Sequence, residues 1–231
     1  DIYWRIIRIN GDGSTRMIYQ GTDVDSSTMN DQIDTSPFNE SDDASYYVGL
    51  KYTQNEQHGQ SVKSTILNEL DLWYNNNLSD VSVYIDSNIG FCNDRNAASG
   101  DTWSVDGSFS YAPYERLNGN SIPNLNCDNR ADILKIPIGL INVDEVVFAG
   151  LLYLKGNSNN YLNSNRSYWT MSSSRFTSLA LQFYVSGSFI FDITVTSNHG
   201  VRPVINLKAD TFFTGEGTKD NPFTVVMNKD E

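Results

Sequence analysis

The sequence predicts an α+β fold that is rich in β-strands, has one or two helices and contains long irregular loops. Short apolar and aromatic segments alternate with turn residues along most of the chain, as they do in strands joined by loops. Only residues 62–73 show sustained helical spacing. The 231 residues, 39% of them hydrophobic, suffice for a sizeable core. We therefore expect one domain over 1–231, with a hairpin and a helix in 1–90 and a loop-rich β half in 91–231.

The N-terminal segment predicts a β-hairpin. Trp4, Ile6 and Ile7 open a first strand, turn residues occupy 10–13, and apolar residues at 17–19 continue in a second strand. Residues 22–46 are polar and acidic without a sustained period, which predicts a loop. The stretch YYVGLKY that follows predicts a short strand.

One helix is expected next, and its apolar positions have helical spacing: Val62, Ile66, Leu67, Leu70 and Trp73. Either Ser61 or Ser64 could cap this helix, because a serine hydroxyl accepts from the free amides of a first turn. Residues 75–77 are asparagines and should end it.

The second half predicts loops and then a series of strands. Residues 92–130 look like a loop assembly, and ADILKIP (131–137) predicts a helical turn stopped by Pro137. LINVDEVVFAG (140–150) predicts a strand with residues 146–148 as its buried run. Four more strands are expected in RSYWTMSSS, SLALQFYVS, GSFIFDITVT and GVRPVINLKA, and a turn with a last edge strand in GEGTKDNPFTVV.

The charge of the chain argues against a nucleic-acid ligand. Its formal net charge is −12, from 16 basic and 28 acidic residues, and this field repels phosphate backbones. No apolar run approaches the ~20 residues of a membrane-spanning helix, so direct membrane insertion by this segment is not expected. Because the chain begins abruptly on a strand-like segment, we expect a truncated or mature form that lacks an N-terminal region.

Two cysteines, Cys92 and Cys127, lie too far apart for a CxxC redox or zinc motif. Two buried free thiols are one interpretation. A disulfide that ties two asparagine-rich loops is favoured, because such loops have little core of their own. A disulfide would indicate an oxidising, extracellular compartment.

Catalytic motifs are sparse in the sequence. No G-x-S-x-G motif occurs, and only His58 and His199 could act as a histidine base. Asp144 and Glu145 adjoin a predicted strand and are candidates for a carboxylate pair, although charges at a strand edge are the simpler interpretation.

No cofactor is expected, and metal-binding motifs are equally sparse. No H-E-x-x-H motif occurs. Two acidic loops have oxygen ligands that calcium accepts, but neither has the EF-hand spacing and solvated loops are the simpler interpretation; their acids are Asp23 and Asp25, and Glu40, Asp42 and Asp43.

Five segments, in this order, resemble a family of bacterial extracellular domains associated with Gram-positive and related gut bacteria. They are YWRIIRINGDGSTRMIY (3–19), FCNDR (91–95), YWTMSSS (168–174), GVRPVINLKAD (200–210) and GEGTKDNPFTV (215–225). The resemblance implies a C-type-lectin-like fold, which is shared with formylglycine-generating enzymes. It also implies a membrane anchor or a type IV pilin-like helix before the domain.

Two narrower resemblances bear on function. The segment GVRPV is similar to the Gly-Phe-Arg ending of variable proteins diversified by retroelements, with Val201 in place of the aromatic residue. Those proteins present variable side chains just before the closing strand. Formylglycine-generating enzymes need a reactive cysteine pair near the C-terminal part of the site, and no cysteine follows Cys127, so oxidase activity is not expected.

These observations favour a secreted or surface-displayed binding module, adhesin-like, whose partner is an extracellular protein or a glycan. Aromatic residues mixed with Ser, Thr, Asn and Gly are typical of binding surfaces, although alternating aromatics in strands usually face a core. The predicted ligand-facing residues are Ser173, Ser174, Arg175, Phe176, Thr177, Ser186, Ser188, Ile190, Thr194, Thr196, Ser197, Asn198 and His199. The alternatives are a structural head domain of a pilin-like subunit, with contacts that serve pilus or surface assembly, and a carboxylate-dependent hydrolase.

Five residues are expected to be structural: Trp4, Trp169, Gly200, Arg202 and Pro203. Gly200 should turn the chain with a positive φ, and Arg202 should offer its guanidinium to a carboxylate or to loop carbonyls. Pro203 should stiffen an irregular position, after which residues 204–207 return to the core.

Overall fold

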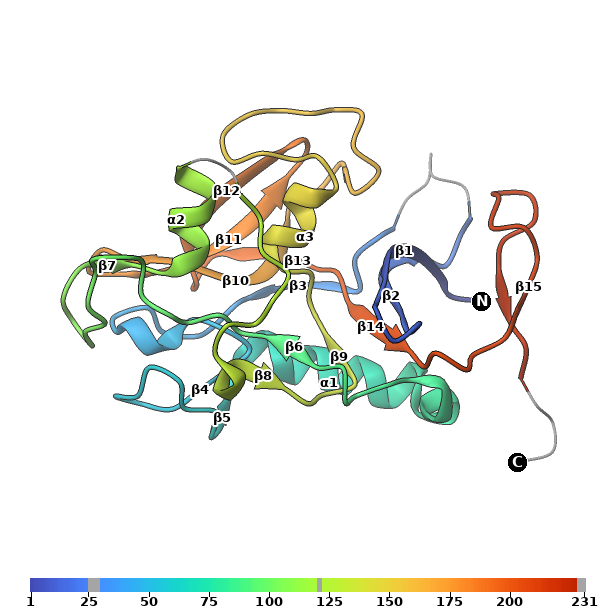
Figure 1. The fold of residues 1–231 in the computed structure, drawn as a ribbon, viewed down its shortest axis with the longest axis horizontal. Coiled ribbons are helices and arrows are strands. Elements are labelled where there is room, and N and C mark those ends of the chain that lie inside the picture. Colours follow the sequence, from blue (N-terminus) through green and yellow to red (C-terminus); the bar gives the residue numbers. More distant parts are fainter. Residues whose placement is uncertain (25–29, 120–121, 228–231) are drawn as a thin grey trace.

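The computed structural model describes residues 1–24, 30–119 and 122–227 (Figure 1). These residues form a β-rich α+β fold, as predicted. Within them the structure has three α-helices rather than one or two: α1 (Thr65–Asn77), α2 (Ala112–Asn118) and α3 (Val143–Phe148). Three short 3-10 helices accompany them: η2 (Ser45–Tyr47), η3 (Ser79–Tyr84) and η4 (Arg130–Asp132).

Two sheets carry most of the strands. The four-stranded sheet has the order β1 (Tyr3–Ile9), β2 (Thr15–Gly21), β14 (Val204–Leu207) and β9 (Ile138–Gly139). The six-stranded sheet has the order β12 (Phe189–Thr194), β11 (Ala180–Ser186), β10 (Tyr168–Phe176), β13 (Asn198–Val201) and β3 (Asp34–Pro37), and β7 (Phe109–Ser110) also pairs with β10.

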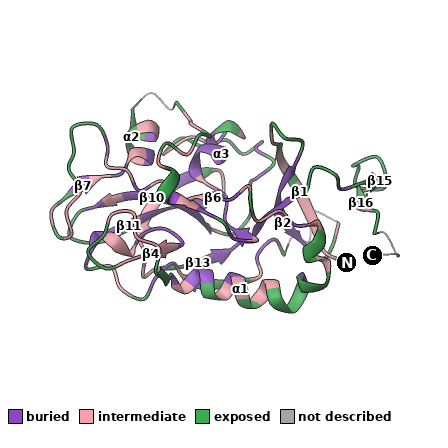
Figure 2. Ribbon diagram, turned by 60° about the horizontal axis from the view of Figure 1, so that its bottom comes forward, coloured by how far each residue is buried: buried purple, intermediate pink, exposed green. Residues whose placement is uncertain are grey.

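Three two-stranded ladders complete the strands of the described residues: β4 (Lys51–Tyr52) with β5 (Val62–Lys63), β6 (Phe91–Cys92) with β8 (Ile133–Leu134), and β15 (Phe213–Thr214) with β16 (Thr224–Val225). The β15–β16 hairpin projects from the body, and its positions are largely exposed (Figures 1 and 2). The body has one cluster of buried hydrophobic residues, which extends from Met17 to Leu207 and includes side chains of both large sheets.

The predicted N-terminal hairpin is confirmed as β1 and β2, which pair antiparallel. The turn between them is closed by the amide of Asn10, which donates to the Ser14 carbonyl oxygen at 2.8 Å. Asp12 accepts from the Ser14 amide at 3.0 Å, and Gly13 has a φ of 89°, which favours glycine. Trp4, expected to be structural, packs edge-on against Tyr19.

Helix α1 confirms the predicted helix and shows which of the two serines caps it. Ser64 is the N-cap and its hydroxyl accepts from the amide of Leu67, so Ser61 is not the capping residue. Ile66, Leu67 and Leu70 are buried on the core side. Val62 lies in β5 instead and is exposed, because the helix begins only after the cap.

The predicted strand over 140–150 is wrong, because its central residues form helix α3. Asn142 and Glu145 make a capping box: the Asn142 side chain accepts from the Glu145 amide, and the Glu145 carboxylate accepts from the Asn142 amide. Two free amides of the first turn are satisfied in this way, and the helix then buries Val143, Val146 and Val147. The cap and the tertiary packing therefore outweigh the β-propensity of the valines.

Other segments also differ from the prediction: α2 and β7 lie within 92–130, which was predicted as loops, and YYVGLKY begins in η2 and forms a strand only at β4. Residues 34–37, expected in a loop, form β3, which pairs with β13 in the six-stranded sheet. The helical turn expected over 131–137 is shorter and earlier: η4 covers Arg130–Asp132, and the residues that follow form β8. Asn129 caps η4 by accepting from the Ala131 amide, which explains the shift.

The closing segment GVRPVINL is divided between the two large sheets. Strand β13 ends at Val201 in the six-stranded sheet, and β14 begins at Val204 in the four-stranded sheet. Arg202 and Pro203 stand where the chain passes from one sheet to the other, and the Pro203 carbonyl oxygen accepts from the Tyr19 amide at 2.8 Å. The break between β13 and β14 is thus the point where the chain crosses from the six-stranded to the four-stranded sheet.

Arg202 confirms its expected role. It is completely buried, its Nε donates to the Tyr19 carbonyl oxygen at 3.0 Å, and its Nη1 donates to the Leu162 carbonyl oxygen at 3.0 Å. Asp31 lies 3.5 Å from the same Nη1. This guanidinium therefore joins β2, the loop before β10 and the segment before β3.

The predicted positive φ at Gly200 is wrong, since Gly200 lies in β13 and is not one of the positive-φ glycines. The requirement for glycine is steric. A Cβ at this position would overlap the side chain of Gln32, whose Nε2 donates to the Ser167 carbonyl oxygen at 2.9 Å.

The predicted disulfide is present between Cys92 and Cys127, which are 35 residues apart in sequence. It ties the loop that follows α2 to strand β6. Across the described residues, no helix combines the length and the apolarity needed to cross a membrane.

Candidate functional site

The predicted ligand-facing residues lie on β10 to β13 and on the turns that join them, but they are not all available at the surface. Ser173, Ser174 and Ile190 are buried, which corrects their assignment as ligand contacts, and Phe176 is buried except where its side chain lines the hollow described below. They occupy inner strands or inward-facing positions of the six-stranded sheet. The remaining predicted residues are half-buried or exposed: Arg175, Thr177, Ser186, Ser188, Thr194, Thr196, Ser197, Asn198 and His199.

Arg175 is held in place by a polar network. Its Nε and Nη2 donate to Oδ2 of Asp192 at 3.1 and 2.9 Å. The same carboxylate accepts from the Ser174 hydroxyl at 2.8 Å and from the Tyr153 hydroxyl at 2.9 Å. The guanidinium carbon also lies 4.5 Å from the centroid of the Tyr114 ring, within cation–π range.

The electrostatics of this network keep Arg175 charged. Burial lowers the pKa of Arg175, but its hydrogen bonds and charge interaction with Asp192 outweigh that effect, so the net shift is upward. Burial, with Asp192 beside it, raises the pKa of Tyr153, which therefore stays a neutral donor. The side chain of Arg175 remains 32% exposed, so a charged group of fixed orientation faces the surface.

A hollow of about 290 Å³ adjoins Arg175. It forms because β7 pairs with the end of β10, which sets Ser110 opposite Arg175 and Phe109 opposite Phe176. Its lining combines hydroxyls, aromatic rings and one guanidinium, and we call it the Arg175 hollow: Ser108, Phe109, Ser110, Tyr114, Arg175, Phe176 and Thr177. The sequence interpretation missed Ser108, Ser110 and Tyr114, because only the β7–β10 pairing and the packing of α2 bring them here. It also missed Tyr153, which reaches Asp192 because its loop forms a bridge with Ile190 of β12.

His199 belongs to a separate row of aromatic rings, the aromatic row, which consists of Phe189, Phe191, Tyr184, His199 and Trp169. Adjacent ring centroids are 5.6, 5.9, 4.2 and 4.8 Å apart along this order. Trp169 is buried at one end, as expected, and Phe189 is exposed at the other. Phe191 and Asp192 are consecutive in β12, so the aromatic row and the Arg175 network lie on opposite faces of the sheet.

The predicted residues are thus divided between two surfaces. Nδ1 of His199 lies 2.7 Å from the Ser167 hydroxyl, and burial lowers the pKa of the imidazole. Thr194 and Thr196 both donate to the Asp42 carboxylate, so their hydroxyls hold the turn after β12 to the loop that follows β3. Arg175 and Thr177 lie together in the Arg175 hollow, away from His199.

The candidate carboxylate pair does not share one site. Asp144 is buried and accepts from Arg116 at 3.0 and 2.7 Å. Glu145 is buried beside Arg16, whose Nε lies 2.5 Å from Oε1 of Glu145. The two acids therefore form ion pairs with different arginines.

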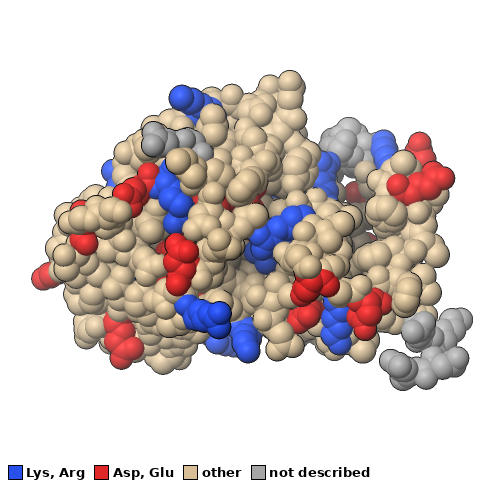
Figure 3. Space-filling model, viewed as in Figure 1, with Lys and Arg blue, Asp and Glu red and all other residues tan. Residues whose placement is uncertain are grey.

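The acidic loops also have structural contacts. Asp42 accepts from two threonines, as described above, and Asp25 lies outside the described residues. Among the described residues, no group of three or more His, Cys, Asp or Glu side chains is arranged to hold a metal ion. Basic and acidic side chains are interspersed over the face shown in Figure 3.

Comparison with protein-family models, with curated proteins and with solved structures gives no match to this chain.

Proposed function

We propose that this chain is a secreted or surface-displayed binding module with a C-type-lectin-like scaffold, and that its ligand contacts the Arg175 hollow. The observation that carries the proposal is the fixed, partly exposed guanidinium of Arg175 at the wall of a hollow lined by hydroxyls and aromatic rings. Ligand sites combine such apolar walls with a few convergent polar groups.

The contacts of Arg175 make it suited to recognition. Because Asp192 and Tyr114 already fix the side chain, little rotamer entropy remains to be lost when a ligand binds. The hydroxyls of Ser108, Ser110 and Thr177 can donate and accept, as the hydroxyl-rich surface of a glycan or the polar surface of a protein requires. We expect a ligand with an acceptor or acidic group opposite Arg175.

We also propose that the module lies outside the cell and that the segment before Gly200 varies between copies. The Cys92–Cys127 disulfide supports an oxidising, extracellular compartment. The resemblance of GVRPV to the ending of retroelement-diversified proteins makes the segment before Gly200 a candidate for programmed variation. A reverse-transcriptase gene and a near-copy of that segment in the neighbouring DNA would support this part, and their absence would remove it.

Binding to arrays of glycans and of extracellular proteins tests the site. The Arg175→Gln and Tyr114→Ala variants should lower the affinity for any ligand found with the original chain by about tenfold or more, as loss of a central anchor does. Thr218→Ala, a matched control in the distant C-terminal hairpin, should not. Unchanged binding by Arg175→Gln, with a native circular dichroism spectrum, would exclude the hollow as the ligand site.

A second candidate function, the head of a pilin-like subunit, is favoured by the C-terminal hairpin. The hairpin and its flanks expose large apolar side chains, which are costly in water and typical of contact surfaces: Phe212, Phe213, Phe223, Val226 and Met227. If they serve assembly, Phe213→Ser with Phe223→Ser should abolish filaments of the full-length protein and leave ligand binding intact. Filaments that persist in this variant would count against the assembly role.

A further inference from the structure

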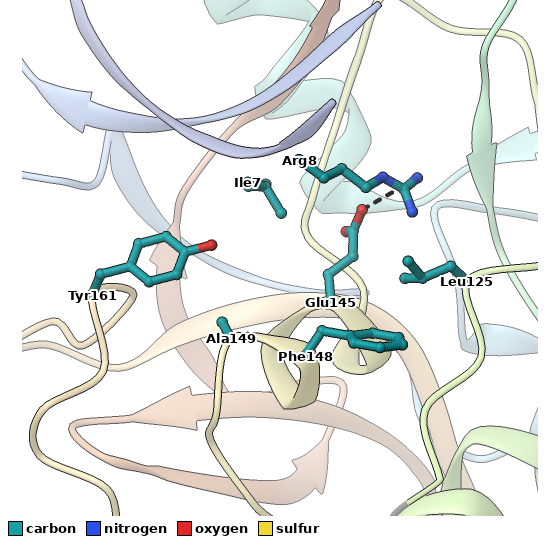
Figure 4. Close-up of a pocket in the computed structure, with 7 residues that line it drawn as sticks. All are labelled: Ile7, Arg8, Leu125, Glu145, Phe148, Ala149 and Tyr161. Atoms are coloured by element: carbon teal, nitrogen blue, oxygen red, sulfur yellow. Dashed lines mark ion pairs between the residues drawn. The ribbon is translucent and has the colours of Figure 1, made fainter. Parts of the chain in front are cut away.

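A second, smaller hollow lies between the N-terminal hairpin and helix α3 (Figure 4). Its volume is about 120 Å³. Its lining comes from β1, from α3 and its C-terminal cap, and from two loops: Ile7, Arg8, Leu125, Glu145, Phe148, Ala149 and Tyr161. We call it the α3 hollow.

The surface that the α3 hollow offers to an occupant is apolar. The side chain of Glu145 is 1% exposed and its carboxylate lies against Arg16 and Arg8, so it is withdrawn from the opening. Leu125 and Phe148, by contrast, are 40% and 60% exposed. Covering large apolar side chains at a concave surface removes hydrocarbon from water, which favours an apolar occupant.

The size of the α3 hollow suits one aromatic side chain. A closed cavity of about 150 Å³ lined by Leu, Ile and Phe holds one benzene molecule. At about 120 Å³, the α3 hollow takes most of one ring and leaves the rest at its opening. It is well below the ~300 Å³ at the lower end of pockets for drug-sized ligands.

The C-terminal hairpin presents a ring of this size. Phe212, directly before β15, is 71% exposed, more than any other large hydrophobic side chain of the described residues. The next residue, Phe213, pairs with Val225, which packs against the core cluster. Because successive residues of a strand point to opposite faces, Phe212 is directed away from the body. The Val226 amide donates to the Phe212 carbonyl oxygen at 2.9 Å, which fixes the backbone that carries the ring.

The hairpin and the α3 hollow of one copy lie apart. Along the long axis of the molecule, β1 lies between α3 and the C-terminal hairpin (Figure 1). In this arrangement Phe212 meets an α3 hollow only on another copy of the chain. Each copy has one such ring and one such hollow at different places, so the contact joins unlike surfaces and can continue from copy to copy.

The charges beside the two surfaces are opposite in sign. Strand β1, which forms one wall of the hollow, carries Arg5 and Arg8 and no acidic residue, and the side chain of Arg8 is 27% exposed. The turn of the C-terminal hairpin carries two exposed acids, Glu216 and Asp220, against the single lysine Lys219. Two copies with a formal net charge of −12 each repel one another, so a basic strand is a favourable place for an acidic turn to approach.

We propose that Phe212 of one copy inserts into the α3 hollow of a second copy, so that the chain associates head to tail. The ring packs against Ile7, Leu125 and Phe148, and the acidic turn lies beside β1. This inference rests on the assembly role proposed above for the C-terminal hairpin, and it names the surface that receives the hairpin. One side chain in one hollow makes a small interface, so the association is weak and depends on concentration.

Sedimentation velocity of the full chain over a series of concentrations, with the disulfide intact, measures the association. The original chain should form dimers and then longer species as its concentration rises. Phe212→Ala should lower the association constant about tenfold or more, the effect of losing a central anchor. Leu179→Ser, which removes an exposed apolar side chain between β10 and β11, is the control and should associate as the original chain does. An original chain that stays monomeric up to millimolar concentration would overturn the proposal.

Variants of the hollow test the receiving surface. Ala149→Leu places a side chain where the ring would lie and should lower the association constant about tenfold or more. Phe148→Ser removes an exposed wall of the hollow and should act in the same direction, which provides a readout should Ala149→Leu disturb α3. If Phe212→Ala weakens association and neither hollow variant does, the hairpin binds elsewhere: the assembly role then stands and the α3 hollow is refuted.

A mixture of two variants completes the test. Phe212→Ala keeps an open hollow, and Ala149→Leu keeps the ring, so each lacks only what the other retains. An equimolar mixture should form a one-to-one dimer and no longer species, although each variant alone is largely monomeric at the same concentration. A mixture that is as monomeric as its two components would overturn the proposal.

Discussion

Replacing the buried Arg202 by methionine tests whether this residue holds the crossing between the two sheets. Its guanidinium donates to the carbonyl oxygens of Tyr19 and Leu162 at 3.0 Å each and to Oε1 of Gln20 at 3.4 Å, and it lies 3.5 Å from Asp31. Methionine fills much of the volume but leaves these acceptors without their donor and leaves a buried carboxylate without its cation. Removing one partner of a buried ion pair costs about 3–5 kcal/mol, so we expect a loss of about 4 kcal/mol.

Thermal and urea unfolding, followed by circular dichroism with the disulfide intact, measure this loss. For a chain of this size about 4 kcal/mol corresponds to a fall in Tm of roughly 8–16 °C. The double variant Arg202→Met with Asp31→Asn should recover about 1–2 kcal/mol, because it no longer buries an uncompensated charge. A loss below about 1 kcal/mol in the single variant, or strict additivity in the double variant, would refute the reasoning.

Three further variants test other contacts of the fold. Gly200→Ala should cost about 1–3 kcal/mol in thermal unfolding, because the new Cβ displaces Gln32, and Gln32→Ala should relieve part of that loss in the double variant. Cys92→Ala with Cys127→Ala should lower the free energy of unfolding by about 4 kcal/mol, the loop-closure value for a separation of 35 residues; a change near zero would contradict it. Burial lowers the pKa of His199, so the imidazole binds a proton more readily in the unfolded chain than in the folded one. The free energy of unfolding should therefore fall as the pH is lowered below ~6.5, and His199→Gln should reduce this dependence on pH.

The elements that the sequence predicts well are those with a complete local signal. The turn of the N-terminal hairpin contains its own closing groups, and Ser64 precedes an apolar pattern of helical period. Helix α3 also has a local signal, Asn142 three residues before Glu145. The sequence nevertheless predicts a strand here, because Val143, Val146 and Val147 have strong β-propensity.

The candidate site could be predicted only in part, because its two walls come from distant segments. Arg175 and Thr177 were expected at the surface and line the hollow. Ser110 and Tyr114 reach it through the pairing of β7 with β10 and the packing of α2, which no local pattern in the sequence encodes. Ser174 is predicted at the surface because it lies near a turn, but it is buried and its hydroxyl donates to the Asp192 carboxylate.

The pairing of β2 with β14 has a kinetic consequence. Arg16 and Asn206, which meet in the interior, are 190 residues apart in sequence. The hairpin of β1 and β2 is synthesised before its partner strand β14, which follows nearly all of the remaining described residues. Non-local pairing of this kind slows folding, because the loop must close before the contact contributes any stability. During that interval the edge of β2 that later pairs with β14 has no partner strand, and we expect β2 to be the segment of the nascent chain most in need of a chaperone.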